Sequence, residues 1–156
     1  TTFSPDKDNC VPTAMVNGSV LQGVPHDPKA RQLGSDCGSA GLFSTMSDLI
    51  KISKGYIGLD DNILPYDQET VTKLFENKNH AGVQPRSWGW DLRFDPEFNY
   101  PIILHTGFTG TLILLDRVKK SGMIVLTNRV HPTGHNQVFL AMREKIIQSF
   151  LKENEQ

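Results

Sequence analysis

The segment from residue 88 to residue 127 constrains the fold most, because its apolar side chains recur at strand spacing. Apolar and polar residues alternate over 88–94, which is the period of a half-buried β-strand. Three apolar runs follow at 102–104, 111–116 and 123–127, separated by turn-forming residues. The segment therefore predicts four strands in an antiparallel meander. The last two runs are almost wholly apolar, so we expect them to lie centrally, with both faces covered.

Helical signals flank these strands. Thr45 is an N-cap for a helix that ends at Gly58, and Asp67 begins a shorter helix that runs to about residue 77. Asn136 precedes a C-terminal helix. The expected apolar faces are Leu49, Ile50, Ile52 and Ile57 in the first helix, and Phe139, Met142, Ile146, Ile147 and Phe150 in the last. These patterns predict an α+β fold, an antiparallel meander with the C-terminal helix packed on it.

Residues 1 to about 44 show neither period and are rich in Gly, Pro, Asn, Asp and Ser. This composition predicts irregular chain with one short strand. Irregular segments of this length seldom order themselves. Either a partner segment stabilises this region or it folds around an active site.

The 156-residue chain is long enough for one domain, and 38% of its residues are hydrophobic. Its 16 basic and 17 acidic residues give a formal net charge of -1, which argues against nucleic acid as a partner. No apolar run approaches the roughly 18 residues of a membrane span. The chain begins Thr-Thr-Phe-Ser, without an initiator Met or an apolar leader, so we expect a piece of a longer protein.

Metal-binding signals are weak. Cys10 and Cys37 are the only cysteines, and they either form one disulfide or remain two free thiols. His131 and His135 are four residues apart, but intervening Pro and Gly residues are unsuited to a helical ligand pair. We therefore expect no metal and no organic cofactor.

The most distinctive string is His-Thr-Gly-Phe-Thr-Gly-Thr at residues 105–111. Two glycines here interrupt what would otherwise be a strand, and glycine weakens a strand interior. Either the string forms a bulge or tight bend, or a ligand or another backbone approaches it closely.

This string resembles the third active-site motif, Lys/His–Thr/Ser–Gly, of the serine β-lactamase and penicillin-binding-protein superfamily. The class C β-lactamase-like group, which includes D-Ala-D-Ala carboxypeptidases and esterases, is the most similar branch. Further segments resemble that family in order and spacing, namely residues 23–30, 40–49, 88–90 and 126–132. The resemblance runs from Thr2 to the last helix and implies that the chain is part of a β-lactamase/transpeptidase-like fold.

The resemblance assigns catalytic roles to four residues: His105, Thr106, Gly107 and Phe108. His105 stands where many members have a Lys that helps bind a substrate carboxylate. Thr106 is expected to hydrogen-bond substrate, and Gly107 lets the acyl chain lie against the strand. The backbone N–H of Phe108 would be an oxyanion-hole donor.

Four further residues are candidates for substrate binding: Thr109, Asn128, His26 and Asp27. For the last two a plainer interpretation stays open, that of a loop histidine beside an aspartate that caps a helix.

The family's nucleophile, the Ser of S-x-x-K at a helix N-terminus, lacks a convincing counterpart. Ser4–Lys7 matches this pattern near the start of the chain, and we interpret the match as chance because no apolar helix follows it. Neither Y-x-N nor S-x-N, the family's second motif, occurs in the sequence. Residues 1–156 are therefore expected to form the C-terminal portion of one β-lactamase-like domain, whose N-terminal half is the partner that supplies the nucleophile.

The parent reaction would be acyl transfer through an acyl-enzyme, on a β-lactam, a D-Ala-D-Ala peptide or a small ester. The alternative is a non-catalytic binding or interaction module derived from the same fold. The isolated chain is expected to be inactive and to self-associate through an exposed sheet edge. A member acting on peptidoglycan would work outside the cytoplasmic membrane, and an esterase member in the cytoplasm.

Overall fold

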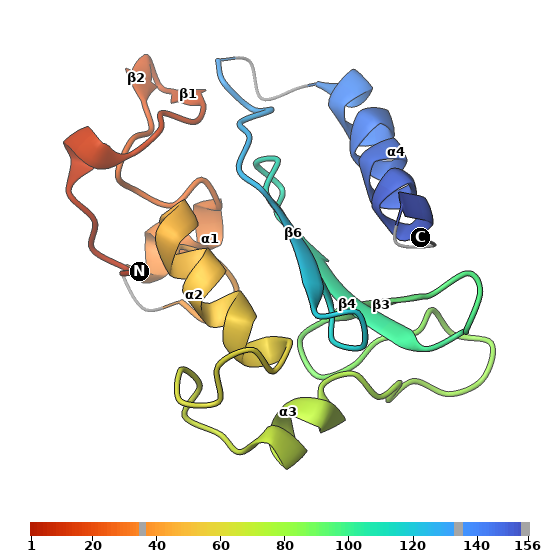
Figure 1. Cartoon of the computed structure of the whole chain (residues 1–156). Coiled ribbons are helices and arrows are strands. Elements are labelled where there is room, and N and C mark those ends of the chain that lie inside the picture. The colour runs from red at the N-terminus through yellow and green to blue at the C-terminus, as the bar shows by residue number, and fades with distance from the viewer. Residues whose placement is uncertain (35–36, 133–135, 154–156) are drawn as a thin grey trace.

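The computed structural model describes residues 1–34, 37–132 and 136–153, and its main feature is a four-stranded antiparallel sheet (Figure 1). The strands lie in chain order, β3–β4–β5–β6, so the sheet is a meander. Their bounds are Asp91–Phe94 for β3, Pro101–Thr106 for β4, Leu112–Asp116 for β5 and Ser121–Val125 for β6. The expected α+β class and meander are confirmed.

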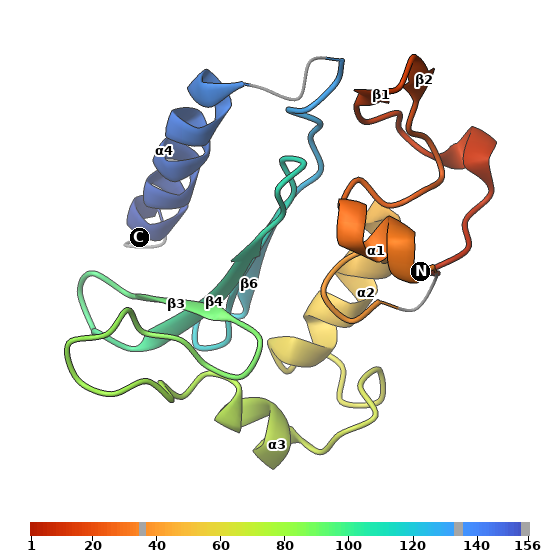
Figure 2. The ribbon, with the colours of Figure 1, turned by 180° about the vertical axis from the view of Figure 1, so that it is seen from behind.

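Helix α4 (Gln137–Glu153) covers one face of the sheet, as both views show (Figures 1 and 2). Ile147 and Leu151 pack against the inward side chains of β4 and β5, which are Ile102, Leu104, Leu112 and Leu114. Burial of each such side chain contributes about 1.5–3 kcal/mol. The Asn136 side chain accepts from the Phe139 amide at 3.1 Å, which confirms the expected cap.

The opposite face of the sheet carries α2 (Met46–Tyr56) and α3 (Gln68–Lys73). Its buried cluster consists of Ile57, Leu64, Val71, Phe75, Leu92, Ile103 and Leu115. The caps expected at Thr45 and Asp67 are confirmed, since their side chains accept from the backbone amides three residues on, at 3.2 Å and 2.7 Å. Arg117, in the β5–β6 turn, donates to the Tyr56 carbonyl at 2.7 Å and so fastens the end of α2 to the sheet.

The expected apolar face of α2 is partly wrong. Ile50 and Ile52 are 44% and 38% exposed, whereas Ser53 and Gly55 are buried. Leu64 packs so closely on the helix that a Cβ at Gly55 would lie 2.7 Å from its Cγ atom. Gly55, which has no side chain, therefore lies at the contact with Leu64, and α2 approaches its neighbours more closely than a stripe of apolar side chains would allow.

Two strand expectations also need correction. Strand β6 is not central, because it is the last strand of the meander and pairs only with β5 within the described residues. Strand β3 begins at Asp91, so Trp88 lies outside it and is 58% exposed. The apolar run of β6 thus did not mark a central strand, and the alternating pattern at 88–94 extended beyond the strand itself.

The N-terminal region holds more regular structure than the single strand expected. Strands β1 (Met15–Val16) and β2 (Ser19–Val20) form a hairpin, and η1 (Lys7–Asn9) and α1 (Pro28–Leu33) are short helices. The hairpin turns at Asn-Gly, a pair whose positive φ angles suit a two-residue turn. No helix in the described part of the chain is long and apolar enough to cross a membrane.

Candidate active site

The candidate site is built around the turn that joins β4 to β5. The Gly107 N–H donates to the Thr111 carbonyl at 2.7 Å, and the Gly110 N–H donates to the Gly107 carbonyl at 3.1 Å. A Cβ at Gly107 would lie only 2.1 Å from the Thr111 hydroxyl oxygen, so this position requires glycine. The sequence left open whether this string forms a tight bend, and the structure shows that it does.

Phe108 lies at the outside of this turn. Its side chain is 66% exposed. Within the described residues, its backbone N–H has no hydrogen-bond partner. A free amide at a strand end is available to an oxygen atom of a ligand, which is what an oxyanion-hole donor requires.

Two arginines hold the carbonyls on either side of that amide. Arg129 Nε donates to the Phe108 carbonyl at 2.6 Å, and its guanidinium lies 4.4 Å from the centroid of the Phe108 ring. Arg143, on α4, donates from Nη1 to the Gly107 carbonyl at 3.3 Å. Neither arginine was assigned a role from the sequence, because the contacts join residues 21 and 36 positions apart.

The side chains of His105 and Thr106 point to opposite faces of the sheet, as successive strand residues do. His105 pairs with Ile113, is exposed, and lies on the face that carries α2 and α3. Thr106 is half-buried and lies on the face of α4. Among the described residues neither side chain has a hydrogen-bond partner, so both are free to meet a ligand.

His26 lies beside the turn, because its imidazole stacks on the Phe108 ring with centroids 5.5 Å apart and planes inclined by 21°. Burial, then the charges of Arg31 and Arg129, lower the pKa of His26, although Asp27 opposes them. Its Nδ1 is buried without a partner among the described residues. His26 is thus placed against the candidate oxyanion residue, and its lowered pKa favours the neutral ring.

Asp27 is the N-cap of α1, with Oδ1 accepting from the Ala30 amide at 2.8 Å. The capping interpretation that the sequence left open is therefore present in the structure. A contact of Asp27 with substrate stays a prediction, and its free oxygen would have to make that contact.

Asn128 and Thr109 occupy different positions relative to the turn. The Asn128 amide donates to the Pro12 carbonyl, and its oxygen accepts from the Val130 and His131 amides at 3.1 and 3.2 Å. This side chain holds the N-terminal region against the end of β6. Thr109 belongs to the turn itself, and within the described residues its hydroxyl is unpaired. Both substrate-binding roles stay predictions.

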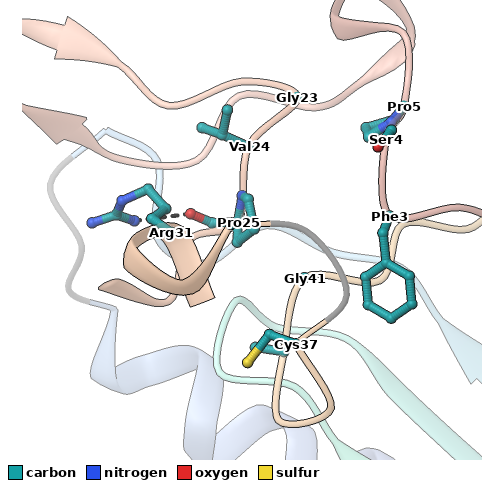
Figure 3. Close-up of a pocket in the computed structure, with 11 residues that line it drawn as sticks. Phe3, Ser4, Pro5, Gly23, Val24, Pro25, Arg31, Cys37 and Gly41 are labelled. Carbon is teal, nitrogen blue, oxygen red and sulfur yellow. Dashed lines mark hydrogen bonds between the residues drawn. The ribbon is translucent and has the colours of Figure 1, made fainter. Parts of the chain in front are cut away.

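A pocket of about 480 Å³ opens beside the loop that carries His26 (Figure 3). It is lined by Phe3, Ser4, Pro5, Gly23, Val24, Pro25, Arg31, Gly34, Cys37, Ala40 and Gly41. Ser4, the first residue of the S-x-x-K string at 4–7, lies ahead of the three-residue η1 and not at the start of an α-helix. Because Lys7 is not one helical turn from Ser4, the match lacks the geometry of an activated nucleophile.

The remaining candidates for metal or redox chemistry are sparse. Cys10 and Cys37 are free thiols, which settles the alternative left open by the sequence. Within the described ranges, no three side chains of the metal-ligating types gather into a site. His135 lies outside the described residues.

Comparison with known proteins places this geometry in a family context. A family model described as Beta-lactamase matches residues 1–145. The N-acetylmuramyl-L-alanine amidase of Bacillus subtilis (strain 168) is 30% identical over 139 residues, covering 80% of this chain and 30% of that protein. Proteins named "Putative D-alanyl-D-alanine carboxypeptidase" from Salmonella paratyphi B and Salmonella newport are 27% identical over 134 residues, covering 80% of this chain and 31% of each protein.

The chain thus spans about a third of the length of these curated relatives, 30% of the first and 31% of the others. No solved structure matches the chain significantly.

Proposed function

The chain belongs to the beta-lactamase family, and we propose that it is the C-terminal portion of a serine hydrolase that works through an acyl-enzyme. The observation that carries the proposal is the His-Thr-Gly turn at 105–107, which is followed by an unpaired Phe108 amide. The N-terminal half of the same domain would supply the nucleophilic serine and its proton acceptor. The chain described here would contribute one wall of the site.

In this reaction the serine Oγ attacks the carbonyl carbon of the substrate and loses its proton to a neighbouring base. The carbonyl oxygen becomes an oxyanion, which accepts a hydrogen bond from the Phe108 N–H. Such a donor contributes about 3–4 kcal/mol to transition-state stabilisation. The carbon–nitrogen or carbon–oxygen bond then breaks, the leaving group takes a proton, and water later hydrolyses the acyl-enzyme.

His105 would contact the substrate beside the reacting carbonyl, whereas a contact of Thr106, which points to the opposite face of the sheet, stays a prediction. His105 is exposed on one face of the strand, within reach of a carboxylate or a peptide carbonyl. A histidine offers less fixed positive charge than the lysine of other members. This difference favours a peptide or ester over a β-lactam, and the name of the Salmonella relatives favours a D-Ala-D-Ala peptide. Such a substrate would place the enzyme outside the cytoplasmic membrane.

The N-terminal half needs a surface to pack against, and we place it at the open edge of β6 and the exposed apolar side of α2. Strand β6 is an edge strand of the four-stranded sheet within the described part of the chain. Ile50 and Ile52 are exposed on the neighbouring helix. An unpaired strand edge next to apolar side chains is a surface that proteins normally cover.

The alternative function is a non-catalytic binding module of the same fold. It would share the turn and the pocket, but no serine would be acylated in any form of the protein. The position of Ser4 before η1 is compatible with this alternative, because it does not give Ser4 the geometry of an activated nucleophile. The two functions differ in whether a covalent adduct forms.

The test is intact-mass spectrometry after incubation with a fluorescent penicillin and, separately, a fluorophosphonate. The 156-residue chain should gain no mass, while the chain joined to its upstream coding segment should gain one adduct. Alanine at the upstream S-x-x-K serine should abolish the adduct, and Ser4→Ala should not. Absence of an adduct from the longer protein would support the binding module. An adduct on Ser4 in the short chain would contradict the half-enzyme proposal.

A further inference from the structure

We propose that Arg143 of α4 is a positioning residue that fixes the direction of the Phe108 N–H. The inference rests on the proposed function, because it concerns the amide assigned there to the oxyanion. It adds to the proposed site a residue of the C-terminal helix α4 that belongs neither to the His-Thr-Gly motif nor to the β4–β5 turn.

The argument begins with the planarity of the peptide group. The Gly107 carbonyl and the Phe108 N–H belong to one planar unit and point in opposite directions. Any contact that fixes the carbonyl therefore fixes the N–H. The Gly107 oxygen accepts from the Gly110 amide at 3.1 Å and from Arg143 Nη1 at 3.3 Å. A cation on the carbonyl also polarises the peptide, which makes its N–H a stronger donor.

Arg143 lies on the sheet-facing side of α4. It lies four and eight residues before Ile147 and Leu151, so the three share one face of α4. Ile147 and Leu151 are buried against the sheet. Arg143 therefore continues the buried stripe towards the turn, where an apolar residue would be usual. The arginine at this position donates a hydrogen bond to the Gly107 carbonyl instead.

Arg129 restrains the next peptide along the chain. Its Nε donates to the Phe108 carbonyl at 2.6 Å, while its guanidinium stacks on the Phe108 ring at 4.4 Å. Successive carbonyls are thus each held by a guanidinium, and the amide between them is left unpaired. Donors held in advance in this way need no reorganisation when charge develops on the substrate.

The matched variants are Arg143→Met and Lys145→Met, which remove one positive charge each from the same helix. Lys145 is exposed, and within the described residues it makes no hydrogen bond to the turn. Arg143→Lys restores a donor and a charge. All three are made in the 156-residue chain and in the longer protein that carries the nucleophile.

In the longer protein, Arg143→Met should slow acylation by fluorescent penicillin about tenfold and leave its initial binding constant within about twofold. The ester carbonyl stretch of the acyl-enzyme should move to higher wavenumber, because a weaker oxyanion donor polarises that carbonyl less. Arg143→Lys should recover most of the rate, and Lys145→Met should match the unsubstituted protein. In the short chain, the Phe108 amide resonance should shift in Arg143→Met but not in Lys145→Met.

Three results would overturn the inference: an unchanged acylation rate and carbonyl stretch in Arg143→Met, an equal loss in Lys145→Met, or an unmoved Phe108 amide resonance. If the unsubstituted longer protein forms no acyl-enzyme, the proposed function fails and the catalytic role of Arg143 falls with it. The amide resonance would still decide whether Arg143 orients the peptide.

Discussion

The imidazole of His26 stacks on the ring of Phe108 with centroids 5.5 Å apart, although 82 residues separate them in the chain. The contact joins the loop before α1 to the turn that carries the unpaired amide. Arg129 also lies against that ring, so Phe108 contacts both the imidazole of His26 and a guanidinium. The contacts of the Phe108 ring with His26 and Arg129 should therefore depend on the protonation state of His26.

The first prediction concerns pH. Burial and the charges of Arg31 and Arg129 lower the pKa of His26 below its ordinary value of 6.5. The unfolded chain then binds more protons than the folded one just below pH 6.5, so the stabilisation present above that pH is lost as the pH falls. An NMR titration should give a His26 midpoint below 6.5. Arg129→Met should raise that midpoint.

Arg86→Met is the matched control, because Arg86 contributes no shift to His26. His26→Phe keeps an aromatic ring on Phe108 and removes the titration, so its unfolding free energy should depend less on pH between 7.5 and 5.5. A midpoint at or above 6.5 in the unsubstituted chain would contradict the prediction.

The second prediction concerns Asp95, a carboxylate that is only 2% exposed. Burial alone would raise its pKa, but the Phe98 amide, Lys119 and the Glu97 amide outweigh burial and lower the pKa to about 2. Their distances to the carboxylate are 2.7, 2.9 and 3.0 Å. Asp95→Ala should lower the free energy of unfolding by about 3 kcal/mol, because it leaves these hydrogen-bond donors without their acceptor.

Urea denaturation at pH 7 measures this loss, and Asp61→Ala at an exposed turn position is its control. The contribution of the carboxylate is present above pH 3.8 and declines as the pH falls towards 2. The difference between Asp95→Ala and the unsubstituted chain should therefore shrink between pH 4 and pH 2.5. A constant difference would mean that the charge of Asp95 contributes nothing.

Local signals predicted much of this fold. The caps at Thr45, Asp67 and Asn136 depend on one side chain and an amide a few residues away, and all three are present. The meander followed from strand period and turn residues in the same way. Asp27 followed by Pro28 carried an equally local signal for α1, an aspartate cap with proline at the first helical position.

Burial was harder to predict, because it depends on which element packs against a residue. Ile50 and Ile52 have the spacing of an apolar face, but α2 contacts its neighbours through Ser53 and Gly55. The contact between Arg143 and Gly107 bridges helix and turn, so no local window contains it. The motif therefore indicated the candidate site, whereas the residues that contact its turn could be identified only from the structure.

The third prediction concerns the edge of β6, where we expect the isolated chain to pair with itself. Its mass by light scattering should rise with protein concentration. Ile124→Lys puts a charge on this edge strand and should keep the chain monomeric, with circular dichroism confirming that it remains folded. Val118→Lys, at a turn residue 62% exposed, should still associate. A chain that is monomeric at all concentrations would contradict an exposed pairing edge.

The last prediction concerns Gly110, which closes the turn with φ +118°. A Cβ there would lie 2.8 Å from the Thr127 hydroxyl oxygen and 3.2 Å from the backbone nitrogen of Arg129. Gly110→Ala should therefore incur backbone strain of about 1–2 kcal/mol and a steric penalty of about 1–3 kcal/mol. Gly82→Ala, at φ +85° with no atom within 4 Å, should incur the strain alone. Urea denaturation of the two variants separates these effects, and equal losses would show that the packing of the turn against residues 127–129 adds nothing.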